Sequence, residues 1–173
     1  LTGIYLKLGT TTLYAGDLTY AYLDELAGLY SDYPGYNTNA VFEQSIVFDY
    51  ENMFLSKKNA IYSTMYNIIA NINNFLEYVD RNKDVLVTER YYGTMKGEAL
   101  GLRAFLHFDL LRMFGPVYKE HPASKAIPYR TAFNKDATPV LSAGEVVIAI
   151  LKDLNEAEEL LKESDPLDFF TNQ

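Results

Sequence analysis

Apolar residues recur at every third or fourth position over three long stretches of the chain, and this spacing constrains the fold more than any other feature. The stretches run from Met53 to Val79, from Thr88 to Gly115 and from Ser142 to Asp165. Positions three and four apart share one face of an α-helix, so each stretch predicts a helix with an apolar stripe. The first two helices would each be about 40 Å long at 1.5 Å per residue. Because only a short polar link separates them, we expect them to pack antiparallel.

Capping residues indicate where these helices begin and end. Thr88 is expected to cap the second helix, and Gly115-Pro116 ends it, because proline cannot continue a helix. Ser142 and Glu145 have the spacing of a capping box, in which each side chain accepts a hydrogen bond from the other residue's backbone N–H. The sequence therefore predicts a sharply defined start for the third helix.

Shorter helices are expected near the beginning of the chain. Asp17 can cap a helix that runs through Leu29, and the segment from Leu1 to Leu8 has the pattern of the end of a further helix. Together these elements predict an all-α fold of long antiparallel helix pairs with loop-rich insertions, in which helices make up more than half of the chain.

Two segments do not have a helical pattern. Residues 30 to 39 combine Pro34 and Gly35 with turn-forming Ser, Asp and Asn residues, and predict an ordered functional loop or a mobile lid. Residues 115 to 139 contain four prolines and the short apolar run from Ala126 to Tyr129. This pattern predicts an extended connection across the helices, with at most a short hairpin between Gly115 and Tyr129.

The apolar stripes also predict which side chains form the core. In the second stretch we expect Phe105, Leu106 and Leu110 to be buried, so that truncating each would be costly. In the third stretch one face carries Val147, Ile150, Leu151, Leu154, Ala157, Leu160 and Leu161, and the other carries Lys152, Asp153, Glu156, Glu158 and Glu159. The second face is expected to meet solvent.

Five polar residues interrupt the second helix, which is otherwise apolar nearly all round. They are Glu98, Arg103, His107, Asp109 and Arg112. Arg103 and His107 are four residues apart and Asp109 and Arg112 are three apart, so both pairs can interact on the helix surface. We interpret the five as a structural polar network that joins this helix to its neighbours, because buried charges need partners. The alternative is that Arg103 or His107 contacts a ligand.

Composition excludes several classes of function. The chain has no cysteine, which rules out disulfides, zinc ribbons, iron–sulfur clusters and cysteine nucleophiles within it. Its formal net charge of −8 would repel a nucleic-acid backbone, so we expect no nucleic-acid partner. No stretch approaches the roughly 20 apolar residues of a membrane-spanning helix.

Catalytic signatures are also missing from the sequence. No Gly-rich phosphate loop with a following Lys and no Gly-x-Ser-x-Gly elbow occurs. Neither His107 nor His121 follows a glutamate at the spacing of a di-iron site, so no metal site is expected. Carboxylate pairs such as Asp24 with Glu25 point apart on a helix. We therefore expect a protein that is not an enzyme and holds no cofactor.

One segment resembles a known family. Residues 97 to 118 read GEALGLRAFLHFDLLRMFGPVY, which is similar to a signature of the SusD/RagB family of outer-membrane nutrient-binding lipoproteins. Flanking residues extend the similarity to about residues 18 to 164. They are Tyr66, Ile69, Asn73 and Leu76 before the signature, and Ala126–Tyr129, Glu145, Ile150, Leu151, Asp153, Leu154, Ala157 and Leu161 after it.

The resemblance implies both a fold and a function. It implies tetratricopeptide-like helix pairs, and a single N-terminal domain over residues 1–173 of a longer protein, since SusD-like proteins are much longer. It also implies a non-catalytic component on the surface of the outer membrane that captures oligosaccharide or another nutrient for a SusC-like TonB-dependent transporter. A lipid anchor upstream of the chain would hold it at the membrane. The competing function is a helical scaffold for protein interaction, without a sugar site of its own.

A ligand site is expected in the loop from Tyr30 to Asn39. Sugar rings need flat aromatic surfaces beside hydrogen-bonding groups. Tyr30, Tyr33 and Tyr36 supply the aromatic rings, and the polar groups come from Asp32, Asn37 and Asn39. The alternative is a tyrosine-rich turn that packs on its own helices or on the remainder of the protein.

Overall fold

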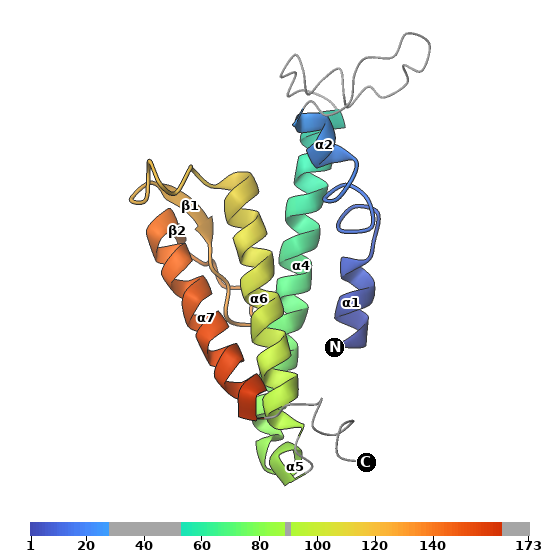
Figure 1. Cartoon of the computed structure of the whole chain (residues 1–173), viewed down its shortest axis with the longest axis vertical. Helices are drawn as coiled ribbons and strands as arrows, with labels where there is room; N and C mark the ends of the chain where they lie inside the picture. The colour runs from blue at the N-terminus through green and yellow to red at the C-terminus, as the bar shows by residue number, and fades with distance from the viewer. Residues whose placement is uncertain (28–52, 89–90, 164–173) are drawn as a thin grey trace. The chain divides into compact units, whose positions relative to one another are not determined.

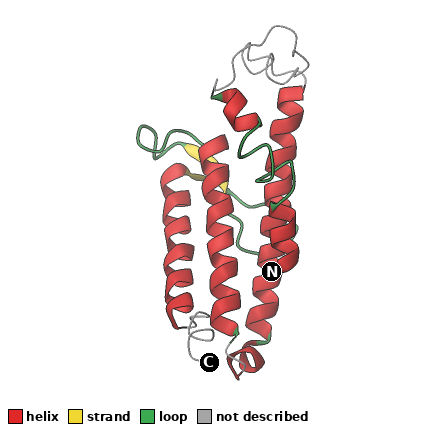
Figure 2. Cartoon of the chain, turned by 45° about the vertical axis from the view of Figure 1, so that its right-hand side comes forward, coloured by secondary structure: helices red, strands yellow, loops and turns green. Residues whose placement is uncertain are grey.

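The computed structural model of the chain describes residues 1–27, 53–88 and 91–163. Figure 1 shows mostly helices, with two short strands that Figure 2 marks in yellow. The chain divides into two compact units, residues 2–68 and the residues from Ile69 onward. The helix α4, Met53–Arg81, runs through the division. Each unit is described separately below.

The first unit contains α1 (Thr2–Leu8), α2 (Tyr22–Leu26) and the first part of α4. The prediction of a helix over residues 1 to 8 is confirmed. The prediction of a helix from Asp17 to Leu29 is wrong over its first turn, where residues 9–20 form a series of hydrogen-bonded turns. Gly16 lies so close to the backbone that a Cβ atom there would meet the Thr11 carbonyl oxygen at 2.5 Å.

Asp17 holds this turn region to α4 in place of capping a helix. Its carboxylate is buried and forms an ion pair of 2.8 Å with the Lys57 Nζ. Ten residues further along α4, the Asn67 side chain accepts a hydrogen bond of 3.0 Å from the Lys7 Nζ. The two contacts fasten the turn region and α1 to α4.

The second unit is built on the end of α4, α6 (Tyr92–Phe114) and α7 (Ala143–Glu163), with the short helix α5 (Lys83–Thr88) between α4 and α6. Hydrogen bonds join Asn73 to Arg103 and Asp80 to Tyr92, so α4 and α6 run antiparallel, as predicted. The apolar stripe predicted between Met53 and Val79 is buried in both units: Ile61, Met65 and Ile68 in the first, and Ile69, Ile72, Leu76 and Val79 in the second.

The start of α6 differs from the prediction. Thr88 is the last residue of α5, and the N-cap position of α6 is Tyr91, whose side chain makes no capping hydrogen bond. The residues read as a polar link therefore include a helical turn of their own. At its other end α6 finishes at Phe114, with Gly115 at the C-cap as expected.

The helix α7 begins with the predicted capping box. The Ser142 backbone N–H donates to the Glu145 carboxylate at 2.8 Å, and the Glu145 N–H donates to the Ser142 Oγ at 3.3 Å. The next backbone N–H groups donate to the preceding connection, from Ala143 to the Ser124 carbonyl and from Gly144 to the Pro122 carbonyl. The first turn of α7 is therefore held to residues 122–124.

The extended connection contains one strand of a two-stranded antiparallel sheet. Its strands are β1, Lys125–Pro128, and β2, Val140–Ser142, with Lys125 opposite Ser142. The extended segment was predicted correctly, but a hairpin between Gly115 and Tyr129 was wrong, because β1 pairs with a strand beyond that range. β1 packs on both α6 and α7.

Several predictions of burial on α6 and α7 are wrong. Leu106 and Leu110 are fully buried as expected, whereas Phe105 is 43% exposed. Leu151 and Leu154, placed in the core stripe of α7, are also exposed. Asp153, assigned to the solvent face, is buried with 5% of its surface exposed. The reason for the last difference is a partner on α6.

Candidate functional site

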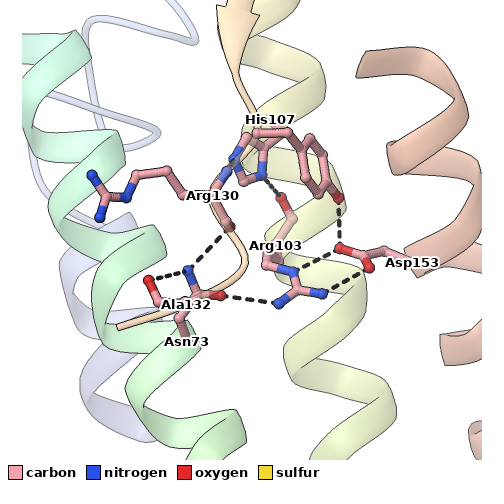
Figure 3. A network of polar contacts seen from close by, with 7 residues as sticks. Asn73, Arg103, His107, Arg130, Ala132 and Asp153 are labelled. Atoms are coloured by element: carbon pink, nitrogen blue, oxygen red, sulfur yellow. Dashed lines mark hydrogen bonds and ion pairs between the residues drawn. The ribbon is translucent and has the colours of Figure 1, made fainter. Parts of the chain in front are cut away.

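An ion pair between α6 and α7 lies at the centre of the best-defined polar cluster (Figure 3). The Arg103 guanidinium donates to both oxygens of Asp153, from Nε at 2.7 Å and from Nη2 at 2.8 Å. Both side chains are almost completely buried. Such two-point pairing is the strongest geometry between arginine and carboxylate, and it neutralises both charges away from water.

Two further side chains complete the hydrogen bonds of this pair. The Tyr129 hydroxyl, just after β1, donates to the Asp153 Oδ2 at 2.5 Å. The Arg103 Nη1 donates to the Asn73 Oδ1 on α4 at 3.0 Å. The Asn73 side-chain amide in turn donates to the carbonyl oxygens of Arg130 and Ala132, at 3.1 and 3.5 Å. Residues 129–132 are thereby held to α7 through Asp153 and to α4 through Asn73.

His107 lies one turn beyond Arg103 on α6 and is fully buried. Its Nε2 accepts a hydrogen bond of 3.1 Å from the Arg130 backbone N–H, so the ring proton belongs on Nδ1, which lies 2.9 Å from the Arg103 carbonyl oxygen. The ring stacks on Tyr129 with centroids 3.9 Å apart. A neutral histidine satisfies this geometry, whereas a second proton would break the bond from Arg130.

The ionisation of the cluster follows from its burial. Burial lowers the pKa of His107 to about 4, and the nearby Arg103 charge adds to this shift. Burial and the hydrogen bond to Asp153 raise the pKa of Tyr129. For Arg103, burial opposes the charged form, but the hydrogen bonds and charge of Asp153 outweigh it and raise its pKa. Near neutral pH the histidine and tyrosine are uncharged and the arginine is charged.

A second polar cluster joins the same helices closer to solvent. The Lys96 Nζ lies 3.1 Å from the Asp80 carboxylate on α4 and 3.4 Å from Glu156 on α7. The Tyr92 hydroxyl donates to Asp80 at 2.8 Å. Partial burial opposes the charge of Asp80, but the hydrogen bonds from Tyr92 and Lys96 outweigh it and lower its pKa. Asp80 remains 52% exposed at its side chain.

All five polar residues predicted as a network on α6 lie within the described residues. Arg103 and His107 belong to the buried cluster. Asp109 and Arg112 pair with each other at 3.0 Å, with the Arg112 side chain largely exposed. Glu98 is half-buried and lies five positions from Arg103, which places it on another face of the helix.

The predicted ligand residues Tyr30, Asp32, Tyr33, Tyr36, Asn37 and Asn39 lie outside the described residues. Within the ranges that the structure describes, no group of three or more His, Cys, Asp or Glu side chains could hold a metal ion. The helices described are also too short or too polar to cross a membrane. The polar atoms of the buried cluster hydrogen-bond to one another and thereby join α4, α6 and α7.

A family model described as "Starch-binding associating with outer membrane" matches residues 13–172. The chain belongs to the SusD-like family. The signature residue Arg103 and the flanking Asp153, which carried the resemblance, are the two partners of the buried ion pair. Membership of this family and the helices described above confirm the predicted all-α SusD-like fold. Tetratricopeptide-like stacking of further helix pairs stays a prediction.

One solved relative has the same fold. It is a SusD superfamily protein from Bacteroides thetaiotaomicron, which aligns with a TM-score of 0.68 over 91% of this SusD-like chain at 18% sequence identity. The aligned region is 35% of that chain, so the SusD-like chain spans about a third of its length. A search of curated proteins found no significant match.

Sequence reasoning did not place Asn73, Tyr129, Arg130 or Asp153 in the cluster. For Asp153 a signal was present, because it lies three residues after Ile150 and four before Ala157, on the buried stripe of α7. An acidic residue on a buried stripe predicts a cationic partner on a neighbouring helix, and Arg103 is such a residue. Nothing local indicated that Arg130 would contribute its backbone N–H.

Proposed function

We propose that this chain is the N-terminal domain of a longer cell-surface protein that binds glycan without catalysis and passes it to a TonB-dependent transporter. The observation that carries this proposal is the family match over residues 13–172, with its description as starch-binding and associated with the outer membrane. A SusC-like transporter is the proposed partner. A lipid anchor upstream of the chain is proposed to hold the protein at the outer membrane, facing outward.

The arrangement of polar groups supports binding over catalysis. Arg103, His107 and Asp153 engage one another inside the second unit, where a substrate would have to displace their hydrogen bonds. Removing one partner of a buried ion pair leaves an uncompensated charge, which is costly. We therefore assign this cluster to the scaffold, and ligand contacts to surface loops that the scaffold positions.

The loop from Tyr30 to Asn39 is the proposed glycan contact. Its tyrosines offer stacking faces for the apolar side of a sugar ring, and its Asp and Asn side chains offer hydrogen bonds to hydroxyls. This part of the proposal rests on the residues of the loop alone. It is independent of the buried cluster, so the two can be tested separately.

Affinity electrophoresis in gels containing soluble starch or other glycans tests the proposal. The chain should be retarded by at least one glycan, and chromatography of the incubated glycan should find no shorter product. Replacing Tyr33 and Tyr36 together by Ala should abolish the retardation while leaving the thermal midpoint nearly unchanged. Phe108→Ala, which removes an exposed aromatic ring from α6, is the matched control and should bind as wild type.

Three results would count against this function. Release of shorter sugars would indicate an enzyme. Binding that survives the double replacement would exclude the loop. Failure of the wild-type chain to bind any glycan would favour the second candidate, a helical scaffold for protein interaction, which the exposed apolar residues of α6 and α7 also favour.

A further inference from the structure

The residues between β1 and β2, 129–139, form a loop that is fixed at its start and exposed at its tip. The Arg130 backbone N–H donates to the buried His107 ring, and the Arg130 carbonyl accepts from Asn73. Side chains at positions 131–137 are exposed. We call residues 129–139 the β1–β2 loop. Because buried side chains already hold its start, the loop can contact a ligand with little further loss of conformational freedom.

The Arg130 side chain fastens this loop from the outside. Its Nη2 donates to the Asn134 carbonyl oxygen at 2.7 Å and to the Asn134 Oδ1 at 3.2 Å. Figure 3 shows the side chain extending away from Arg103 and Asp153. Both acceptors on Asn134 are neutral. The two bonds therefore orient the guanidinium without compensating its charge.

Arg130 differs from the other arginines that the structure describes. Each of the others forms an ion pair with a carboxylate: Arg81 with Glu77, Arg103 with Asp153, and Arg112 with Asp109. In residues 1–27, 53–88 and 91–163, no carboxylate pairs with Arg130 or with Lys135 on the same loop. This holds although the chain has 23 acidic and only 15 basic residues. The Arg130 guanidinium can therefore accept a carboxylate from a ligand.

An exposed aromatic ring adjoins this cation in the sequence. Phe133 is 54% exposed and directly precedes Asn134, against which the guanidinium lies. The apolar face of a sugar ring can pack on such a ring. The β1–β2 loop carries two cations, Arg130 and Lys135, and one carboxylate, Asp136. Its local charge is thus positive on a chain whose net charge is −8.

We propose that the β1–β2 loop binds a uronic acid unit of a glycan, with the sugar ring on Phe133 and its carboxylate paired with the Arg130 guanidinium. Arginine suits this role because its planar fork of N–H groups matches the two oxygens of a carboxylate. Lys135 adds a second positive charge on the same loop. The inference rests on the proposed glycan-binding function, to which it adds a second contact region and a class of sugar.

Other ligands fit the loop less well. A neutral sugar would leave the Arg130 charge without a partner. A nucleic acid is a dense polyanion that the net charge of −8 repels, whereas a uronic acid carries one charge, and carboxylates beyond about 8 Å are largely screened at physiological salt. An acidic peptide also offers a carboxylate. However, a stable protein interface covers about 800 Å² on each partner, and Phe133 is the large apolar side chain of this loop.

Isothermal titration calorimetry tests the proposal with short oligosaccharides that each carry one uronic acid. They are released from gellan, hyaluronan and glucuronoxylan, and each is compared with its form in which the carboxyl is reduced to an alcohol. We expect the chain to bind at least one acidic oligosaccharide, and its reduced form at least about tenfold more weakly. Arg130→Gln and Phe133→Ala should each weaken binding of the acidic form by a similar factor.

Two matched controls remove the same residue types from the exposed side of α6. Arg112→Gln and Phe108→Ala should bind the acidic oligosaccharide as the wild type does. Phe133→Ala leaves the contact between Arg130 and Asn134 in place, so it tests the site even where Arg130→Gln loosens the loop. Thermal midpoints of all four variants check that each remains folded.

Several results would overturn the inference. They are equal binding of the acidic and reduced forms, unchanged affinity in Phe133→Ala and Arg130→Gln, and equally tight binding of a short polyglutamate peptide, which would assign the loop to acidic peptides. Binding of neutral glycans such as starch without binding of any uronic acid would overturn this inference alone. Binding of neither class of glycan would overturn it together with the proposed function, so the two failures are distinguishable.

Discussion

Two polar clusters join the same three helices, and they differ in their exposure to water. Arg103 and Asp153 pair in the interior with side chains 9% and 6% exposed, whereas Asp80 and Lys96 pair with side chains 52% and 18% exposed. Both pairs have short contacts, at 2.7 and 3.1 Å. From these distances alone, the two ion pairs would be expected to contribute similarly to stability.

Burial makes their energetic roles different. In water, an ion pair replaces hydration that each charge already had, so it adds little to stability. In the interior, neither charge can regain that hydration if its partner is lost. The buried cluster therefore determines whether α6 and α7 can pack in this register, while the exposed cluster adds a modest preference.

The largest effect expected is from removing Asp153. Asp153→Ala leaves the Arg103 charge buried without its carboxylate, which should reduce the free energy of unfolding by about 3 to 5 kcal/mol. Asp80→Ala is the matched control on the exposed pair and should cost less than about 1 kcal/mol. Urea denaturation followed by circular dichroism measures both.

A double variant separates the effect of the two charges from the effect of packing at the same positions. Arg103→Met with Asp153→Leu replaces both charges by apolar side chains of similar size, and it should recover much of the stability lost in Asp153→Ala. Equal losses in Asp153→Ala and Asp80→Ala would contradict the distinction between the two clusters.

The next effect concerns pH and His107. Its pKa falls to about 4 in the folded protein, whereas histidine in an unfolded chain has a value of about 6.5. As the pH falls, the unfolded chain takes up this proton before the folded protein does. The contribution of His107 to stability is therefore fully present above pH 6.5 and is lost as the pH falls toward 4. The contribution is about 3 kcal/mol at its full extent.

His107→Gln should remove this part of the pH dependence while lowering stability at neutral pH. Urea denaturation at several pH values between 7 and 4 measures the difference from wild type. His121→Gln replaces an exposed histidine and is the control. An unchanged slope in His107→Gln would mean that the buried ring does not resist protonation as its contacts suggest.

The smallest effects expected concern the spacing of α6 and α7. Gly97→Ala places a Cβ atom against Leu161 and the Ala157 carbonyl, and overpacking of this kind costs about 1 to 3 kcal/mol. Gly101→Ala, one turn along the same helix, meets no atom within 4 Å and should stabilise the chain by up to about 1 kcal/mol through helix propensity. Thermal denaturation of the two variants should therefore show shifts of opposite sign.

Shifts in the same direction would mean that the two helices can separate slightly at Gly97. In that case the register that aligns Arg103 with Asp153 would not depend on close approach of the backbones. The glycine pair thus tests whether backbone contact or the buried ion pair sets the distance between the helices.

The sequence by itself determined where the long helices lie. The apolar stripe of α4 and the capping box at Ser142 and Glu145 were predictable because their interactions join residues three or four apart. Sequence similarity to a family then indicated that Arg103 and Asp153 matter, without indicating that they meet.

Only the tertiary structure decided which faces are covered. Periodicity shows which positions share a face, but α6 is apolar nearly all round, so its sequence could not distinguish buried Leu106 from exposed Phe105. Three interactions join residues more than ten positions apart. They are the pairing of β1 with β2, the ion pair that buries Asp153 against Arg103, and the hydrogen bond from Arg130 to His107. Such contacts depend on how the helices pack, and packing is a property of several elements together.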